Sequence, residues 1–297
     1  MFSKDFCPKP YALGLAPIYA VSGTSCSLAH GQKWILNGDD AKGKCEFPMG
    51  YAAKRIRHLV GKAIHSHNMI RDGEHVLVAV SGGKDSLALL WLLRERLKRI
   101  RISYEITAVH VDLGFGVDTA SSMEEFFKTH GFQYKIVRTK IGPKAHGPEN
   151  RENPCFLCSR LRKKVLFELA DEMGISKIAV GHNKDDLIET FFINILYGAS
   201  ISTLVPVQEF FGGKIKIIRP LYLTDEALIR RYAGDMNWPT IDSGCPTAGS
   251  SKRQQVKDIL SGLYQSNKKI KGNIFHAMRN VKMEYLPQGV MNQDADY

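Results

Sequence analysis

From residue 51 onward, the hydrophobic positions of the 297-residue chain alternate between two patterns. Short, almost continuous apolar runs are typical of buried strands, and longer stretches with apolar residues every three or four positions are typical of helices. The predicted strands are residues 75–80, 102–112, 133–139, 177–181 and 214–219. The predicted helices are residues 51–69, 87–97, 119–130, 156–173, 185–197 and 225–236. This alternation predicts an α/β fold with a parallel sheet sandwiched by helices.

The segments outside this pattern divide the chain. Residues 1–50 are rich in Gly, Ser, Pro and Cys and show little periodicity, so we expect an N-terminal appendage. Residues 51–265 are predicted to form the nucleotide-binding core, and residues 266–297 a basic C-terminal tail. Inside the core, residues 141–153 contain two prolines and two glycines and are predicted to be a polar loop.

The first predicted strand runs directly into a glycine turn that precedes a helix. The turn is Ser81, Gly82, Gly83, Lys84, Asp85 and Ser86. The two glycines allow a tight turn with inward-facing amides, and the helix that follows adds free N–H groups and the positive end of its dipole. Lys84 supplies a point charge, Ser86 can donate to a phosphate oxygen, and Asp85 is suited to hold Mg²⁺. The turn does not have the Walker spacing, and it predicts a site for the phosphate chain of a nucleotide.

Two further segments are expected beside this turn. Ligands of parallel α/β sheets bind at the carboxyl ends of the strands. Val111 lies at the end of the second predicted strand, and His182 follows the fourth. Both are therefore predicted to border the nucleotide.

Three of the six cysteines form a candidate metal or redox site. Cys155 and Cys158 have Cys-x-x-Cys spacing, and Cys245 lies far downstream. The spacing fits zinc, which usually takes four ligands, a dithiol redox pair, which would not use Cys245, or an iron–sulfur cluster, and it does not decide among them. Arg160 and Arg162 near Cys158 are expected to lower the pKa of its thiol. The remaining cysteines have no ligand spacing and are predicted to be structural thiols: Cys7, Cys26 and Cys45.

The chain carries a formal charge of +11, with basic clusters around residues 54–62, 160–164 and 252–282. This surplus predicts a polyanionic partner, RNA or DNA. No apolar run approaches the ~20 residues that would span a membrane. Residues 11–21 are interrupted by Pro17 and are not expected to be a signal peptide. A loop that consumes ATP favours a cytoplasmic protein.

The glycine turn resembles the PP-loop of the N-type ATP pyrophosphatases, which transfer AMP to a carbonyl oxygen and release pyrophosphate. Together with the three cysteines it resembles the tRNA 2-thiocytidine synthetases, the TtcA family, over residues 54–260. Further matching motifs are Cys158-Ser159-Arg160-Leu161-Arg162, Gly181-His182-Asn183-Lys184-Asp185-Asp186, Ile218-Arg219-Pro220-Leu221 and Arg253-Gln254-Gln255-Val256.

The resemblance implies a reaction. ATP would adenylate the C2 carbonyl oxygen of cytidine 32 in the tRNA anticodon loop, and sulfur from a 4Fe–4S cluster would replace it to give 2-thiocytidine. It implies Cys155, Cys158 and Cys245 as cluster ligands, Asp186 and Arg162 at the reacting centre together with Lys84, and residues 81–86 around the phosphates with Mg²⁺. It also implies tRNA, a cysteine desulfurase or free sulfide as sulfur donor, and a homodimer.

The chain departs from the family pattern at one position. Asp242 stands where the family often has a second cysteine, three residues before Cys245. Other readings of the same residues are a tRNA thiolase acting on another base, an AMP-forming ligase of the lysidine synthetase type, and a non-enzymatic RNA-binding iron–sulfur protein.

Overall fold

A computed structural model of the chain describes residues 50–236, 238, 241, 244–249 and 251–287. These residues belong to one compact unit, residues 47–297. The predicted N-terminal appendage, with Cys7, Cys26 and Cys45, lies outside the described residues, as does Asp242.

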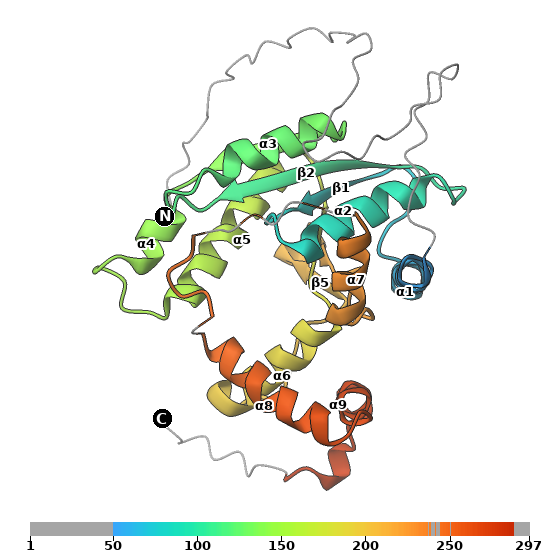
Figure 1. Ribbon diagram of the computed structural model, residues 1–297, viewed down its shortest axis with the longest axis vertical. Helices are drawn as coiled ribbons and strands as arrows, with labels where there is room; N and C mark the ends of the chain where they lie inside the picture. Colours follow the sequence, from blue (N-terminus) through green and yellow to red (C-terminus); the bar gives the residue numbers. More distant parts are fainter. Residues whose placement is uncertain (1–49, 237, 239–240, 242–243, 250, 288–297) are drawn as a thin grey trace, which may run out of the picture. The chain divides into compact units, whose positions relative to one another are not determined.

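The described chain contains a six-stranded sheet with the order β3-β2-β1-β4-β6-β5 (Figure 1). The strands are β1 (Glu74–Ala79), β2 (Tyr104–Asp112), β3 (Tyr134–Arg138), β4 (Lys177–Val180), β5 (Val207–Phe210) and β6 (Ile215–Ile218). All neighbouring strands are parallel except β5, which is antiparallel to β6. The predicted α/β class is confirmed, and the five predicted strands are present. The edge strand β5 was not predicted, because four residues give too short a pattern to recognise.

Six helices agree with the sequence prediction to within a few residues. They are α1 (Tyr51–Ser66), α2 (Lys84–Leu97), α3 (Thr119–Thr129), α5 (Pro154–Glu172), α6 (Lys184–Gly198) and α7 (Glu226–Met236). The structure adds α4 (Ile141–His146), α8 (Lys252–Ser266), α9 (Ile270–Ala277) and 3₁₀ turns at Phe211–Gly213 and Met283–Tyr285. The predicted polar loop at 141–153 is therefore wrong in its first half. Pro143 is tolerated because it lies in the first turn of α4, where its missing N–H is not needed. The helix buries the side chains of Ile141 and Ala145.

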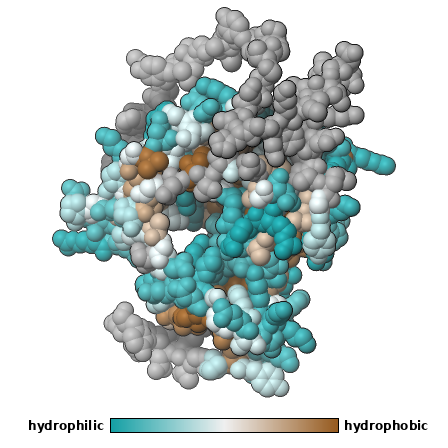
Figure 2. All heavy atoms as spheres, viewed as in Figure 1, coloured by the Kyte–Doolittle hydropathy of each residue, from teal (hydrophilic) through white to brown (hydrophobic). Residues whose placement is uncertain are grey.

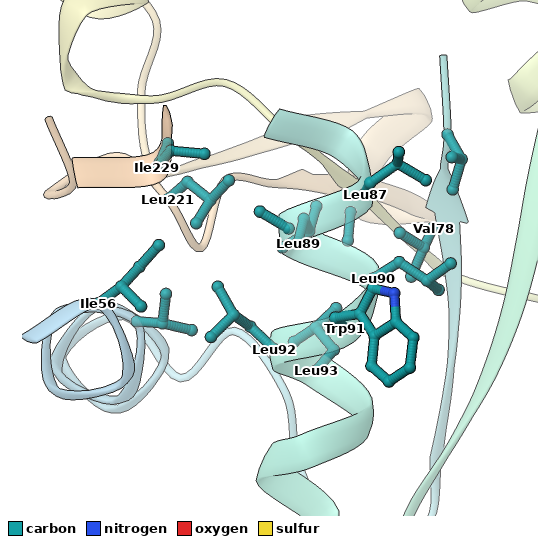
Figure 3. Close-up of a cluster of buried hydrophobic side chains, with 14 of the residues drawn as sticks. Ile56, Val78, Leu87, Leu89, Leu90, Trp91, Leu92, Leu93, Leu221 and Ile229 are labelled. Carbon is teal, nitrogen blue, oxygen red and sulfur yellow. The ribbon is translucent and has the colours of Figure 1, made fainter. Parts of the chain in front are cut away.

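Two apolar clusters lie on the two faces of the sheet. On one face, Val76 and Val78 of β1 pack with α1, α2, α3 and α7, and Figure 3 shows the leucines of α2 between Val78, Ile56 and Ile229. On the other face, Leu77 of β1 packs with α4 and α5. Because neighbouring residues of a strand point to opposite faces, the nearly continuous apolar run in β1 supplies both clusters.

The strand order creates a crevice at one point of the sheet. From β1 the chain proceeds outward through β2 to β3, and then returns to place β4 on the other side of β1. At such a switch point the connections after two adjacent strands diverge, which leaves a crevice at their carboxyl ends. The predicted phosphate turn follows β1, and Gly181, His182 and Asn183 follow β4.

The helices at the C-terminal end of the chain pack on α6. Helix α8 contacts α6, and α9 contacts both α6 and α8. Helix α9 lies within the segment that was predicted as a basic tail, and the division of the chain at residues 50 and 265 stays a prediction. No helix in the described part of the chain is both long and apolar enough to cross a membrane. Hydrophilic residues cover most of the described surface on the face drawn in Figure 2, with small separate hydrophobic patches.

Candidate active site

The glycine turn is held in shape by its own serines. Ser81 N–H donates to Ser86 Oγ at 3.1 Å, and Ser86 Oγ donates to the Gly83 carbonyl at 2.9 Å. Gly82 has φ +88°, a conformation that side chains rarely adopt. Helix α2 begins at Lys84 after the N-cap Gly83, and no side chain caps it. Its first N–H groups are therefore left for an anion.

The end of β4 is pressed against this turn. A Cβ atom on Gly181 would stand 2.9 Å from the Ser86 amide nitrogen and 3.0 Å from the Asp85 carbonyl carbon. Only a glycine fits here without moving the first turn of α2. Sequence reasoning did not find this role of Gly181, since the close approach joins segments almost one hundred residues apart.

Lys84 is paired with an acid that the sequence analysis missed. Its Nζ lies 3.0 Å from Glu226 Oε1, and Lys257 lies 2.8 Å from the other oxygen, Oε2. Burial by itself would raise the pKa of Glu226, but the hydrogen bonds and charges of Lys257 and Lys84 outweigh it and lower that pKa to about 2. Glu226 is thus ionised and holds the Lys84 ammonium at the mouth of the turn.

Asn183 links the two aspartates of the site. Its Oδ1 accepts from the amides of Asp185 and Asp186, and its Nδ2 donates to Asp85 Oδ1 at 3.3 Å. Asp186 completes the capping box of α6 by accepting from Asn183 N–H at 2.9 Å, and its Oδ1 accepts from Arg253 Nη1 at 3.1 Å. Burial raises the pKa of both Asp85 and Asp186. Asp186 therefore caps its helix and also holds Arg253.

The three cysteines converge from two distant segments. Cys155 and Cys158 lie in the first turns of α5. Thr247 Oγ1 lies 3.6 Å from Cys155 Sγ and 3.4 Å from Cys245 Sγ. Burial raises the pKa of the Cys158 thiol, the neighbouring Cys245 and Cys155 act in the same direction, and Arg162 opposes them.

The expected lowering of the Cys158 pKa is therefore wrong. The sequence showed the arginines but not the burial. Arg160 is paired with Glu152 at 3.1 Å instead, and Arg162, one helical turn beyond Cys158, is the cation that acts on the thiol.

Backbone geometry brings Cys245 to this place. Gly244 has φ +65°, and a Cβ there would stand 2.7 Å from Val117 Cγ2 in the loop after β2. His146 Nε2, at the end of α4, lies 4.0 Å from Cys245 Sγ. In the described part of the chain, no group of three His, Cys, Asp or Glu side chains is placed to hold a single metal ion. Two sulfurs, those of Cys155 and Cys245, lie on either side of the Thr247 hydroxyl, with Cys158 as a third nearby thiol. Three cysteines spaced in this way suit a larger group such as an iron–sulfur cluster better than zinc, which usually takes four ligands.

The remaining predicted residues lie at different depths. His182 is half-buried between the two sites, and its Nδ1 accepts from Arg219 Nε at 3.3 Å. Arg162 is near enough to both His182 and Cys158 for its charge to lower the pKa of each. The Val111 side chain is buried in the apolar cluster with Leu77, and its place beside the nucleotide stays a prediction.

A phosphate-binding glycine turn at the switch point of a parallel sheet, with three cysteines nearby, defines a PP-loop nucleotide-binding protein with a thiol site. The family model described as PP-loop domain matches residues 51–242.

Curated proteins narrow the class. The tRNA-cytidine(32) 2-sulfurtransferase of Alkalilimnicola ehrlichii is 37% identical over 78% of this chain and 75% of its own length. The protein of the same name from Geotalea uraniireducens is 34% identical over 78% of this chain and 93% of its own length. The chain belongs to the tRNA-cytidine(32) 2-sulfurtransferase family.

A solved structure shares the fold. The U34-tRNA thiolase NcsA from Methanococcus maripaludis, determined with its 4Fe–4S cluster, is 26% identical and superposes with a TM-score of 0.65. The similarity covers 79% of this chain and 80% of that one.

Proposed function

We propose that this chain is an ATP-dependent tRNA thiolase that converts cytidine 32 of the anticodon loop to 2-thiocytidine. The observation that carries the proposal is the convergence of Cys155, Cys158 and Cys245 beside Arg162 and His182, at the edge of the sheet that also holds the phosphate turn. An AMP-forming ligase needs the turn and has no use for the three sulfurs.

The turn binds and orients ATP. The uncapped N–H groups of the first turn of α2 would face the phosphates, and Lys84 can leave Glu226 to neutralise them. Asp85 would supply a carboxylate oxygen for Mg²⁺, since this ion usually binds through one or two carboxylates together with phosphate oxygens. The C2 carbonyl oxygen of the base then attacks the α phosphate of ATP, the bond between the α and β phosphates breaks and pyrophosphate leaves. The oxygen then carries AMP and has become a good leaving group.

Positive charge lies where the reaction builds up negative charge. Arg162 is near both the cysteines and His182, and Arg253 is held by Asp186 at 3.1 Å. Preorganised cations of this kind stabilise a transition state more than solvent can. We propose that Asp186 acts by orienting Arg253.

The cysteine donors fit an iron–sulfur cluster. Thiolates are the ligands that such clusters take. Cys155 and Cys245 both lie next to the Thr247 hydroxyl, and Cys158 is close enough to both for their charges to affect its pKa. A 4Fe–4S cluster bound there would supply the sulfur-transfer chemistry. The side chains of Arg162 and Thr247 lie next to the cysteine sulfurs. Cys155 is exposed, so tRNA can reach the site from that side.

We further propose the partners of the reaction. The formal net charge of +11 favours binding of tRNA, which is a polyanion. A cysteine desulfurase or free sulfide would supply sulfur, and consumption of ATP favours the cytoplasm. A homodimer is supported by exposed apolar side chains on the packed helices α6 and α8, namely Ile195, Leu196, Tyr197, Ile259 and Leu263.

The proposal is tested in cells that lack this gene. Nucleosides of their total tRNA, measured by mass spectrometry, should contain no 2-thiocytidine. The wild-type chain should restore it, and the Cys245→Ser variant should not. Restoration of 2-thiocytidine by Cys245→Ser, or unchanged 2-thiocytidine in the deletion strain, would contradict the proposal.

A further inference from the structure

A buried arginine lies beneath the proposed active site. Arg219 is the first residue after β6, and only 3% of it is exposed. No carboxylate of the described residues is paired with it. Burial lowers its pKa to about 10, so the guanidinium still carries its charge at neutral pH. A buried charge is costly unless its N–H groups are satisfied, and the partners of Arg219 therefore indicate what it does.

Three acceptors fix the plane of this guanidinium. Nη1 donates to the Val205 carbonyl at 2.6 Å, and Nη2 donates to Gln208 Oε1 at 3.0 Å. Val205 lies two residues before the edge strand β5, and Gln208 is the second residue of that strand. The third donor, Nε, points to His182 Nδ1 at 3.3 Å. The edge strand thus holds the arginine in the orientation that reaches the histidine.

This contact determines where the proton of His182 sits. A guanidinium can only donate hydrogen bonds, so Nδ1 must accept with its lone pair. Burial lowers the pKa of His182 to about 3, and the charges of Arg219, Arg253, Arg162 and Lys163 act in the same direction. The ring is therefore neutral, and its one proton is on Nε2. Within the described part of the chain, Nε2 has no hydrogen-bond partner.

We propose that Arg219 is a positioning residue that fixes His182 as the Nε2–H tautomer, and that this N–H donates to a phosphate oxygen of the bound nucleotide. The cations around the ring favour an anion at this place, and His182 follows β4 directly beside the phosphate turn. The proposed contact with the nucleotide rests on the proposed function, while the tautomer rests on geometry alone.

A second buried histidine provides an internal control. His110 is 3% exposed, and its Nδ1 lies 2.8 Å from the Val80 carbonyl, which can only accept. Its Nε2 lies 3.1 Å from the Thr119 hydroxyl. His110 must therefore be the Nδ1–H tautomer, opposite to that of His182. Both histidines can be observed in one nitrogen-15 NMR spectrum of the histidine-labelled holoprotein, with assignments from His182→Asn and His110→Asn.

We expect a pyridine-type shift at Nδ1 of His182 and at Nε2 of His110. The Arg219→Lys variant keeps the positive charge but loses the planar guanidinium. In this variant, His182 should show a mixture of tautomers, and the spectrum of His110 should be unchanged. A protonated Nδ1 on His182 in the wild type, or an unchanged His182 spectrum in Arg219→Lys, overturns the inference. This readout does not depend on tRNA thiolation, so absence of thiolation would contradict the proposed function and leave the tautomer result standing.

Kinetics test the contact with phosphate. Gln places an amide near the position of Nε2, whereas Asn places it near Nδ1. His182→Asn should lower kcat for AMP formation by ~10²-fold, the usual effect of losing one preorganised donor, and His182→Gln should recover most of that loss. His65→Gln, on the exposed side of α1 and outside the three basic clusters, is the matched control and should behave as wild type. Equal losses in His182→Gln and His182→Asn, or full activity in His182→Asn, contradict a donating Nε2–H.

Discussion

Gly181 and Ser86 are in such close contact that no side chain fits between them. A Cβ on Gly181 would stand 2.9 Å from the Ser86 amide nitrogen, and backbone atoms cannot move aside as a flexible side chain would. The contact joins the end of β4 to the first turn of α2. It therefore sets the position of the phosphate turn relative to His182 and Asn183.

Gly181→Ala is expected to displace the phosphate turn. Overpacking of this kind costs ~1–3 kcal/mol of stability, and the displaced amides should weaken ATP binding by more than tenfold in calorimetric titration. Gly198→Ala is the control, because a Cβ at Gly198 meets nothing within 4 Å. Wild-type ATP affinity in Gly181→Ala would show that the close approach does not shape the turn.

Lys84→Met is expected to abolish most AMP formation. The substitution keeps the length of the side chain and removes the charge that faces the phosphates, which should cost ~10²-fold or more in kcat. Lys257→Met is the comparison, because it removes the second lysine that is paired with Glu226 and leaves Lys84 in place. Pyrophosphate release, followed with tRNA present, measures both. Similar rates in the wild type and Lys84→Met would contradict a phosphate-binding role.

Two glutamates should affect stability with opposite signs as pH changes. The pKa of Glu226 falls from 4.5 to about 2, so its ionised form stabilises the fold above about pH 4.5, and this contribution is lost as pH falls toward 2. The pKa of Glu189 rises to about 7 because of burial and the nearby Asp186, so ionisation costs stability as pH rises from about 4.5 through 7.

Urea denaturation of Glu226→Gln and Glu189→Gln over a pH series measures this difference. Glu226→Gln should be less stable than wild type at pH 6, and the gap should narrow as pH falls toward 2. Glu189→Gln should be more stable than wild type at pH 8 and equal to it near pH 4. A Glu189→Gln variant that is destabilised at pH 8 would show that its carboxylate is stabilised by partners, against the effect of burial.

Each of the three converging cysteines should be needed for iron. Cys155→Ser, Cys158→Ser and Cys245→Ser should lose most of the iron and the brown colour of anaerobically purified protein. Cys45→Ser is the matched control and should keep both. Iron and acid-labile sulfide analysis with absorption spectroscopy provides the measurement, and a Cys245→Ser protein with wild-type iron would remove Cys245 from the site.

The sequence predicted the parts of the fold and site that depend on local patterns. The five parallel strands follow from apolar runs, and the phosphate turn follows from six consecutive residues. The missed features depend on distant partners. The strand β5 is stabilised by pairing with β6, Glu226 reaches Lys84 across more than one hundred residues, and Arg219 acts through His182. The lowered pKa expected for Cys158 failed because burial is a property of the folded chain.

If the PP-loop and the three-cysteine site act together on one tRNA base, thiolation of that base must depend on both. The most direct measurement is nucleoside mass spectrometry after the anaerobically purified protein has been incubated with unmodified tRNA, a sulfur donor and ATP. 2-Thiocytidine should form at position 32 only when ATP is present and only with all three cysteines intact. Full activity of iron-free protein, or an ATP-dependent tRNA product that contains no added sulfur, would show that the two sites do not work together in this way.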